Sequence, residues 1–193
     1  MSTSPYASIV KESRHLPHWL AVTSDLSSGI PENAAHWLLD NTSLTLRVKN
    51  HCMDHDLGCF SVQVLEQKMA MPLDDEIQHL KLKNNDDALI REVLLYCHES
   101  PLIYARTIIP AQTLTGEQRE LGELGDRPLG EFLFSQPGLK RDVMEVAALR
   151  QGHQLFDSAS AHISVKAQEI WARRSVFRLE HKPLLVAEVF LPE

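Results

Sequence analysis

Two charged residues of this sequence lie inside segments that are otherwise apolar. Arg91 belongs to residues 88–98 (ALIREVLLYCH), and Glu188 belongs to residues 184–191 (LLVAEVFL). Both segments have the composition of buried β-strands, in which successive side chains point to opposite faces. Each charge therefore shares a face with apolar neighbours, and an isolated buried charge is costly unless it is paired or hydrogen-bonded.

Three interpretations of this pair are open at the level of pattern. The strands can be exposed to solvent on that face, or Arg91 and Glu188 can form a structural ion pair. Alternatively, both side chains line a ligand pocket, in which Arg91 binds a carboxylate through two parallel hydrogen bonds and Glu188 contacts a hydroxyl group. The third interpretation predicts a site for a small organic acid.

Three other arginines are weaker candidates. Arg106 lies in the strand that is expected to return beside Arg91. It either binds a second anionic group of a ligand or pairs with an acidic neighbour such as Glu92. Arg173 and Arg174 are adjacent in the sequence, and we expect them to form a solvated patch.

Residues 51–59 (HCMDHDLGC) contain two histidines, two cysteines and two aspartates. The spacing of the cysteines fits no standard zinc pattern, and no second ligand pair accompanies it. We therefore interpret this segment as a polar connection and predict no metal site. Cys52, Cys59 and Cys97 cannot all pair within the chain, and without an export signal we expect reduced thiols in a cytoplasmic protein.

The elements that must position these residues follow from hydrophobic periodicity and turn signals. The pattern predicts an α+β domain built around an antiparallel sheet, with its clearest hairpin turning at residues 98–101. Helices are expected at 31–40, from 43 onward, after the 71–76 loop (as a short helix or turn), within 110–124 and at 128–134. Strands are expected at 59–66, 88–98, 102–109, 175–180 and 184–191, and 139–149 is strand-like or mixed. Turns are expected at 84–87 and 181–183.

Length and composition limit the function further. The 193 residues fit one domain, 1–193, with an N-terminal arm at 1–28 and a polar excursion at 150–170 that we interpret as an insertion. A net charge of −7 disfavours nucleic acid and anionic lipid as partners. No apolar stretch is long enough to span a membrane, and we expect a monomer.

Four ordered segments of the chain resemble the chorismate pyruvate-lyase family, whose members supply 4-hydroxybenzoate for ubiquinone synthesis. The resemblance runs from Trp37 to Pro192, and the two anomalous charges fall inside it. The segments are 90–95 (IREVLL), 105–110 (ARTIIP), 128–134 (PLGEFLF) and 182–192 (KPLLVAEVFLP).

The resemblance implies an antiparallel sheet with helices over one face and two helical flaps that enclose an internal ligand pocket. It assigns the carboxylate-binding arginine to Arg91, the glutamate near the product hydroxyl to Glu188 and a backbone ligand contact to Leu129. A fourth contact, commonly a methionine in the family, falls on Leu44, which leaves that wall apolar. The implied activity is a carbon–oxygen lyase that converts chorismate to 4-hydroxybenzoate and pyruvate without a cofactor or metal.

A second class of function shares this architecture. Ligand-sensing domains of bacterial transcription regulators bind small molecules without converting them. The N-terminal arm shows no helix-turn-helix pattern, and a sensor need not carry both Arg91 and Glu188. The sequence thus favours the lyase, with a non-catalytic small-molecule binder as the alternative.

Overall fold

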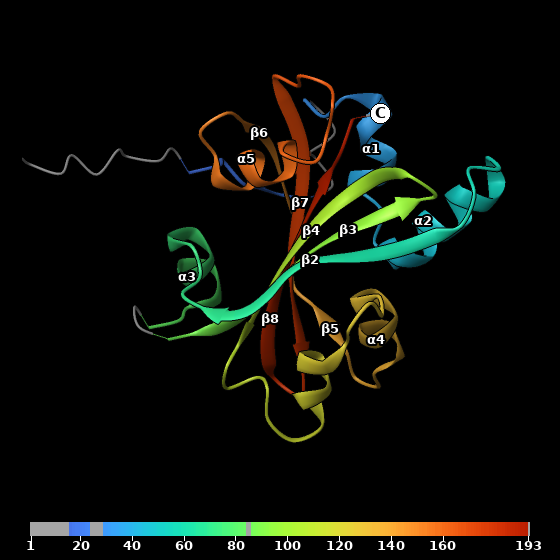
Figure 1. Ribbon diagram of the computed structural model, residues 1–193. Helices are drawn as coiled ribbons and strands as arrows, with labels where there is room; N and C mark the ends of the chain where they lie inside the picture. Colours follow the sequence, from blue (N-terminus) through green and yellow to red (C-terminus); the bar gives the residue numbers. More distant parts are fainter. Residues whose placement is uncertain (1–15, 24–28, 84–85, 193) are drawn as a thin grey trace, which may run out of the picture.

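The computed structural model describes residues 16–23, 29–83 and 86–192. Within them the strands form one antiparallel sheet in the order β1-β6-β7-β8-β4-β3-β2, and β5 pairs with β7 beside this path (Figure 1). The fold class predicted from the sequence is confirmed. The strands are β1 (Leu20–Ala21), β2 (Phe60–Ala70), β3 (Ala88–Cys97), β4 (Ser100–Pro110), β5 (Lys140–Arg141), β6 (Glu145–Arg150), β7 (Glu169–Leu179) and β8 (Lys182–Phe190).

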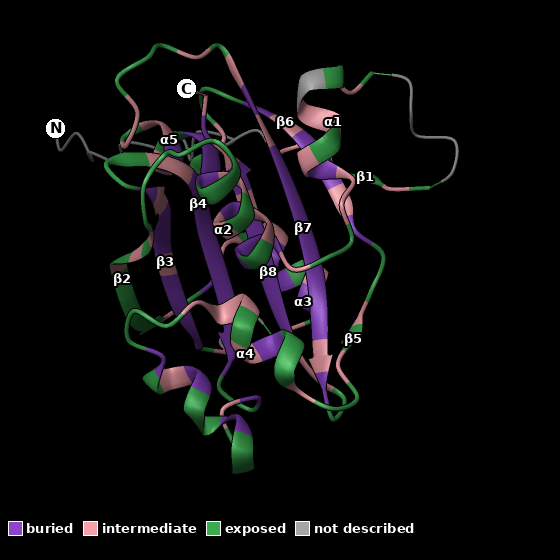
Figure 2. Ribbon diagram, turned by 90° about the vertical axis from the view of Figure 1, so that its right-hand side faces the viewer, coloured by how far each residue is buried: buried purple, intermediate pink, exposed green. Residues whose placement is uncertain are grey.

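The centre of the sheet consists of two hairpins that lie side by side. The β3–β4 hairpin turns at His98, and the β7–β8 hairpin turns at Glu180 and His181, both of which have positive φ angles. Two consecutive positive φ angles are typical of the tight turn that matches strand twist. Figure 2 shows that β3, β4, β7 and β8 are largely buried, whereas the edge strand β2 is mostly exposed. The predicted turn at 84–87 lies partly outside the described residues.

Helices cover both faces of the sheet, and the expectation of helices over one face only is therefore wrong. Figure 1 shows α3 and α5 on one side of the sheet and α1, α2 and α4 on the other. Both faces of the central strands are apolar, so each must be shielded from water. The helices are α1 (Glu32–Leu38), α2 (Leu44–Asp54), α3 (Asp74–Leu80), α4 (Leu129–Ser135) and α5 (Gln154–Ser160), with a 3₁₀ helix η1 at Gly116–Glu123.

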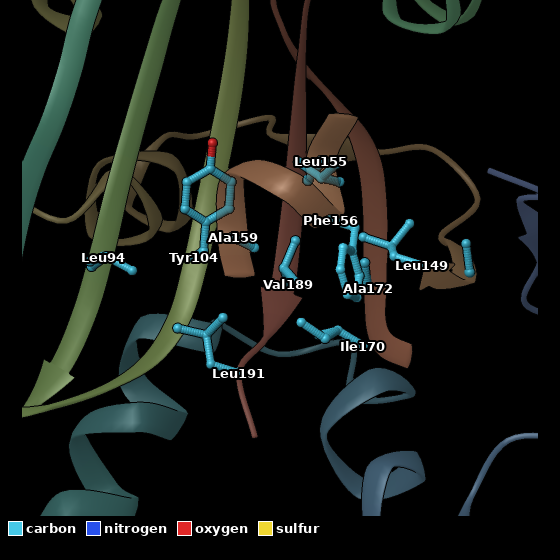
Figure 3. Close-up of a cluster of buried hydrophobic side chains, with 12 residues drawn as sticks. Leu94, Tyr104, Leu149, Leu155, Phe156, Ala159, Ile170, Ala172, Val189 and Leu191 are labelled. Atoms are coloured by element: carbon cyan, nitrogen blue, oxygen red, sulfur yellow. The ribbon is translucent and has the colours of Figure 1, made fainter. Parts of the chain in front are cut away.

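The excursion at residues 150–170 contains α5, which packs on the face that α3 also covers. Leu155 and Phe156 of α5 join a core with Tyr104 of β4 and Val189 of β8 (Figure 3). We refer to this side of the sheet as the α3/α5 face. The excursion therefore completes a core and does not form a flap over the other face.

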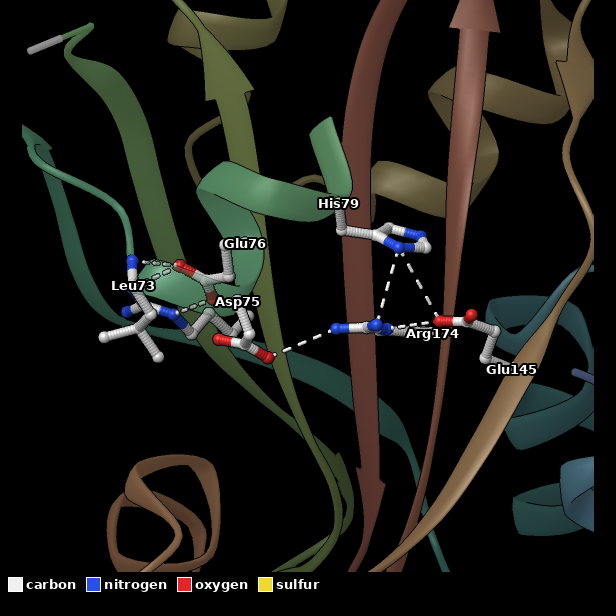
Figure 4. A network of polar contacts seen from close by, with 7 residues as sticks. Leu73, Asp75, Glu76, His79, Glu145 and Arg174 are labelled. Atoms are coloured by element: carbon white, nitrogen blue, oxygen red, sulfur yellow. Dashed lines mark hydrogen bonds and ion pairs between the residues drawn. The ribbon is translucent and has the colours of Figure 1, made fainter. Parts of the chain in front are cut away.

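Two buried arginines hold α3 on the same face. Arg106 binds Glu76 of α3 and Glu92 of β3, while Arg174 lies between Asp75 of α3 and Glu145 of β6 (Figure 4). The same Glu76 accepts a hydrogen bond from the backbone N–H of Leu73 and so caps its own helix. Arg106 pairs with acidic neighbours, which was one of its two predicted roles.

Two further expectations meet different outcomes. Cys52 and Cys97 form a disulfide, so the expectation of reduced thiols is wrong for this pair, while Cys59 is a free, exposed thiol. The bond links residues 45 positions apart, which become neighbours because α2 packs on β3. In the described ranges no helix is long and apolar enough to cross a membrane.

Candidate active site

A cavity lies on the sheet face covered by α2 and α4, which we call the pocket face. The cavity and its mouth together hold about 630 Å³ of empty space, within the range of small-molecule sites. Its floor is formed mainly by β3, β4, β7 and β8, and its roof by the first turn of α2 and by α4. Apolar side chains form most of the wall: Leu44, Val62, Val93, Leu95, Ala105, Leu129, Leu133, Phe134, Phe177 and Val186.

One end of the cavity is marked by Arg91. Its side chain is 2% exposed, and its Nη1 donates to Oε1 of Gln67 at 2.9 Å. Its Nη2 reaches the carbonyl oxygen of Arg127, just before α4, at 3.4 Å. In the described part of the chain Arg91 forms no ion pair, and burial lowers the pKa of its guanidinium. A buried guanidinium without a carboxylate partner is suited to bind an anionic ligand group.

The other end of the cavity is marked by Glu188. Its Oε2 accepts a hydrogen bond from Nε of Arg173 at 2.5 Å, and Arg173 itself is 1% exposed. Nη1 of Arg173 donates to the carbonyl oxygens of Trp37 and Asp40, at 3.1 and 2.6 Å. Arg173 therefore fixes Glu188 and, at the same time, holds the α1–α2 segment over this end of the cavity. The contact of Arg173 with Glu188 uses only Oε2.

Alternation along the strands explains why these side chains converge. Arg91 shares the pocket face with Val93 and Leu95, whereas the next residue, Glu92, points to the α3/α5 face and meets Arg106. Glu188 reaches the same cavity from β8, which is separated from β3 by β4. Arg91 and Glu188 are thus neither solvent-facing nor paired with each other. They lie on one face, around one apolar chamber.

The roof consists of two helical segments that meet above the cavity. The first, residues 37–54, contains α2, whose N-cap Ser43 accepts a hydrogen bond from the backbone N–H of Leu46. The second, residues 125–135, contains α4. The segments touch where Gly130 packs against Thr45, since a Cβ built on Gly130 would lie 2.5 Å from Oγ1 of Thr45. An ion pair between Lys49 and Glu131 joins them at the surface. This arrangement agrees with the two flaps that the resemblance implies.

All four residues proposed from the sequence line this cavity. Leu44 and Leu129 are the first residues of α2 and α4, and they bring the helix N-termini to the chamber that Arg91 and Glu188 delimit. Backbone N–H groups in the first turn of a helix have no partner within the helix and can bind a ligand. Contact of each of the four with a ligand stays a prediction.

Two further arginines of the cavity are absent from the sequence-based proposal. Arg173 and Arg174 are buried, so the predicted solvated patch is wrong, and Arg173 lines the cavity. Arg141 of β5 lines it as well. Within residues 51–59 the two cysteines do not share a site, because Cys52 is bonded to Cys97 and Cys59 is exposed.

Comparisons with known proteins point to one family. The sequence profile of the chorismate lyase family matches residues 17–193. A probable chorismate pyruvate-lyase from Methylococcus capsulatus is 42% identical over 156 residues, which cover 81% of this chain and 93% of that protein. Another from Nitrosospira multiformis is 38% identical over 165 residues, covering 86% and 89%.

A solved structure shares the fold at low sequence identity. It is a transcriptional regulator of the GntR family from Bacillus cereus, with a TM-score of 0.53 and 17% identity over 69% of this chain and 92% of that one. Similarity at this level shows a common architecture only. It agrees with the expectation that domains of bacterial transcription regulators and this protein use the same arrangement of strands and helices.

Proposed function

This chain belongs to the chorismate lyase family, and from that premise we propose that it removes pyruvate from chorismate and leaves 4-hydroxybenzoate. The substrate has a ring carboxylate, a ring hydroxyl and an enolpyruvyl ether with a second carboxylate. The product 4-hydroxybenzoate keeps the first two groups at opposite ends of a flat ring. Within the family this product feeds ubiquinone synthesis, and we propose the same fate here.

The observation that supports this proposal most directly is the polarity of the cavity. A buried guanidinium, Arg91, lies at one end, a carboxylate, Glu188, at the other, and the walls between them are apolar. In our proposal Arg91 binds the ring carboxylate bidentately. Oε1 of Glu188 accepts a hydrogen bond from the ring hydroxyl, while Arg173 keeps Glu188 in place through Oε2.

We propose that the main task of the protein in this reaction is to position the substrate. The bond between the ring carbon and the ether oxygen breaks, and the hydrogen on the hydroxyl-bearing ring carbon is lost. The methylene carbon of the departing enolpyruvate gains a proton, so that the atoms balance as 4-hydroxybenzoate and pyruvate. The ring becomes aromatic and no net oxidation occurs, so we propose catalysis without a cofactor. The cavity contributes orientation, electrostatic stabilisation and exclusion of water.

The roof predicts how the product leaves. We propose that a flat aromatic acid bound under α2 and α4 escapes when the contacts between these segments open. Thr45, Gly130 and the Lys49–Glu131 pair are the contacts that must part. We therefore expect product release controlled by flap opening to limit turnover.

Direct turnover tests the proposed function. Purified protein is incubated with chorismate in the presence of EDTA, and the absorbance of the aromatic product is followed. We expect 4-hydroxybenzoate and pyruvate in equal amounts. Glu188→Gln is expected to lower the rate strongly while the protein still melts cooperatively. If the folded protein binds 4-hydroxybenzoate but never converts chorismate, the proposal fails in favour of a non-catalytic binder.

We also propose a monomer that works in the cytoplasm. All residues that we assign to the site belong to one chain, so the proposed reaction does not require a second copy. A reducing compartment would open the bond between Cys52 and Cys97. Comparing the turnover of oxidised and fully reduced protein tests this location, because an inactive reduced protein would contradict it.

A further inference from the structure

The charges that line the cavity do not cancel. Three guanidinium groups, those of Arg91, Arg141 and Arg173, share the cavity with one carboxylate, that of Glu188. Glu188 neutralises Arg173 through the hydrogen-bonded ion pair described above. Arg91 and Arg141 form no ion pair with any residue that the structure describes. The site thus holds two cations without an ion-pair partner among the described residues, and chorismate has two carboxylates.

The contacts of Arg141 leave most of its hydrogen-bonding capacity unused. Its Nε donates to Oγ of Ser175 at 2.9 Å, but Nη1 and Nη2 have only distant or weak acceptors, the carbonyl of Asn41 at 3.4 Å and the sulfur of Met144 at 3.3 Å. The guanidinium lies over the ring of Phe177, 5.1 Å from its centroid. Burial, and next the nearby positive charge of Arg173, lower the pKa of Arg141. These contacts orient the group without neutralising it.

The position of Arg141 in the sheet fits the geometry of the substrate. Arg91 is on β3 and Arg141 on β5, and the order of the strands between them is β4, β8, β7. Four steps of about 4.8 Å separate the two backbones, and the long side chains reach inward from both sides. The guanidinium of Arg141 is at the Glu188 end of the cavity, because it donates to Ser175, two residues after Arg173, and to the carbonyl of Asn41, which follows the Asp40 carbonyl that Arg173 binds. In chorismate the enolpyruvyl ether is attached next to the hydroxyl-bearing carbon, which is the same end.

Arg173 is less suited to this task although it is closer to Glu188. Its Nε is bound to Glu188, and its Nη1 is bound to two backbone carbonyls of the α1–α2 segment. A ligand carboxylate on Arg173 would have to compete with these contacts. Arg141 would lose only a long hydrogen bond and a contact with sulfur.

From these observations, and on the basis of the proposed function, we infer that Arg141 binds the second carboxylate of chorismate, the one that leaves with pyruvate. Arg141 holds the enolpyruvyl group while its ether bond to the ring breaks. It also offsets the negative charge that develops on the departing oxygen. Because 4-hydroxybenzoate lacks this carboxylate, Arg141 contributes to substrate binding and turnover and little to product affinity.

The test compares a ligand with one carboxylate and a ligand with two. Calorimetry measures binding of 4-hydroxybenzoate and of 3-(carboxymethoxy)-4-hydroxybenzoate, an aromatic diacid that cannot eliminate pyruvate. For Arg141→Gln we expect the affinity for the diacid and kcat/KM for chorismate each to fall by about a hundredfold, with the affinity for 4-hydroxybenzoate nearly unchanged. Arg141→Lys should recover part of the loss. Arg178→Gln, which removes an exposed arginine paired with Asp142, is the matched control.

Each outcome decides the inference. Equal losses for both ligands would mean that Arg141 only supports the shape of the cavity, and unchanged diacid binding would remove it from the site. If Arg141→Gln does not fold, Arg141→Lys provides the same ratio of the two affinities. Absence of chorismate turnover in the unmodified protein would defeat the proposed function alone, because the diacid comparison reports on Arg141 without catalysis.

Discussion

Arginines on the two faces of the sheet differ in their carboxylate partners. On the α3/α5 face the two buried arginines are each held by two carboxylates, and the side chains link α3 to the strands. On the pocket face Arg173 has one carboxylate, that of Glu188, and two arginines, one buried and one half-buried, have no carboxylate partner among the described residues. The first group comprises Arg106, with Glu76 and Glu92, and Arg174, with Asp75 and Glu145; the second comprises Arg91 and Arg141.

The electrostatic consequence differs accordingly. Burial alone would lower the pKa of Arg106, but the hydrogen bonds and charges of Glu76 and Glu92 outweigh burial and raise it. For Arg91 and Arg141 burial dominates, and their pKa values are lowered. A buried cation that is fully paired contributes to the fold, whereas one left unpaired is costly until a ligand supplies the anion. The comparison therefore separates structural arginines from ligand-binding arginines.

The largest effect is expected when a paired arginine is removed. Arg106→Met leaves Glu76 and Glu92 buried without their cation, which costs about 3–5 kcal/mol of stability. Turnover per folded molecule should persist, because Arg106 points away from the cavity. Urea unfolding measures the loss of stability, and assays at low urea measure activity. A variant as stable as the unmodified protein would contradict the structural role of this face.

The second effect is expected when an unpaired arginine is removed. Arg91→Met should weaken binding of 4-hydroxybenzoate by about 2–5 kcal/mol, or roughly 30- to 4,000-fold, because the ligand carboxylate loses its cation. Stability should stay the same or rise, since no protein carboxylate loses its cation. Calorimetric titration and urea unfolding measure the two quantities. A stability loss as large as that of Arg106→Met would erase the distinction between the faces.

The sequence was sufficient to predict which face of the sheet Arg91, Glu188 and Glu92 occupy. Alternation along 88–98 and 184–191 puts Arg91 and Glu188 on apolar faces, because a strand has a period of two whatever its neighbours are. The same rule places Glu92 on the other face, where it meets Arg106. Local patterns therefore identify which residues share a face of the sheet. The resemblance to the chorismate pyruvate-lyase family adds the ligand-binding roles expected of Arg91 and Glu188.

The positions of three other arginines and of the disulfide could not be predicted, because they depend on where strands begin and on which segments pack together. The predicted strand started at residue 175, whereas β7 starts at Glu169, so Arg173 and Arg174 lie inside the sheet. The apolar residues Ile170 to Ala172 carry that signal, but they directly follow a polar segment, and the predicted excursion at 150–170 includes Ile170. Arg141 lies in a strand of two residues, whose pairing with β7 no local pattern reveals. The Cys52–Cys97 bond likewise requires knowing that α2 packs on β3.

A smaller effect sharpens the description of the pocket face. Gly130→Ala would place a methyl group 2.5 Å from Oγ1 of Thr45 and push the two roof segments apart. Overpacking of this kind costs about 1–3 kcal/mol, and we expect it as weaker binding and faster release of 4-hydroxybenzoate. Stopped-flow fluorescence measures the release rate.

Two variants control this prediction. In Gly122→Ala the new methyl group first meets Leu89 at 4.0 Å, so release should be unchanged. Adding Thr45→Ala to Gly130→Ala removes the clashing oxygen and should restore slow release. If Gly130→Ala releases product at the original rate, the contact between α2 and α4 does not control escape.

The smallest effect belongs to the α3/α5 face and concerns His79, whose neighbours are Arg174, Glu145 and Asp75 (Figure 4). Burial, and then the charge of Arg174, lower the pKa of His79, outweighing the acidic groups nearby. Below about pH 6.5 the side chain of His79 therefore takes up a proton in the unfolded chain but resists it in the folded protein, and the free energy of unfolding falls as pH falls.

His79→Gln should flatten this decline in the free energy of unfolding between about pH 7 and about pH 5, measured by urea unfolding. Because the cavity is on the other side of the sheet, affinity for 4-hydroxybenzoate should be the same in both proteins. An equally steep decline in the variant would assign the pH dependence to other groups, and a change in affinity would show that the two faces are not energetically separate.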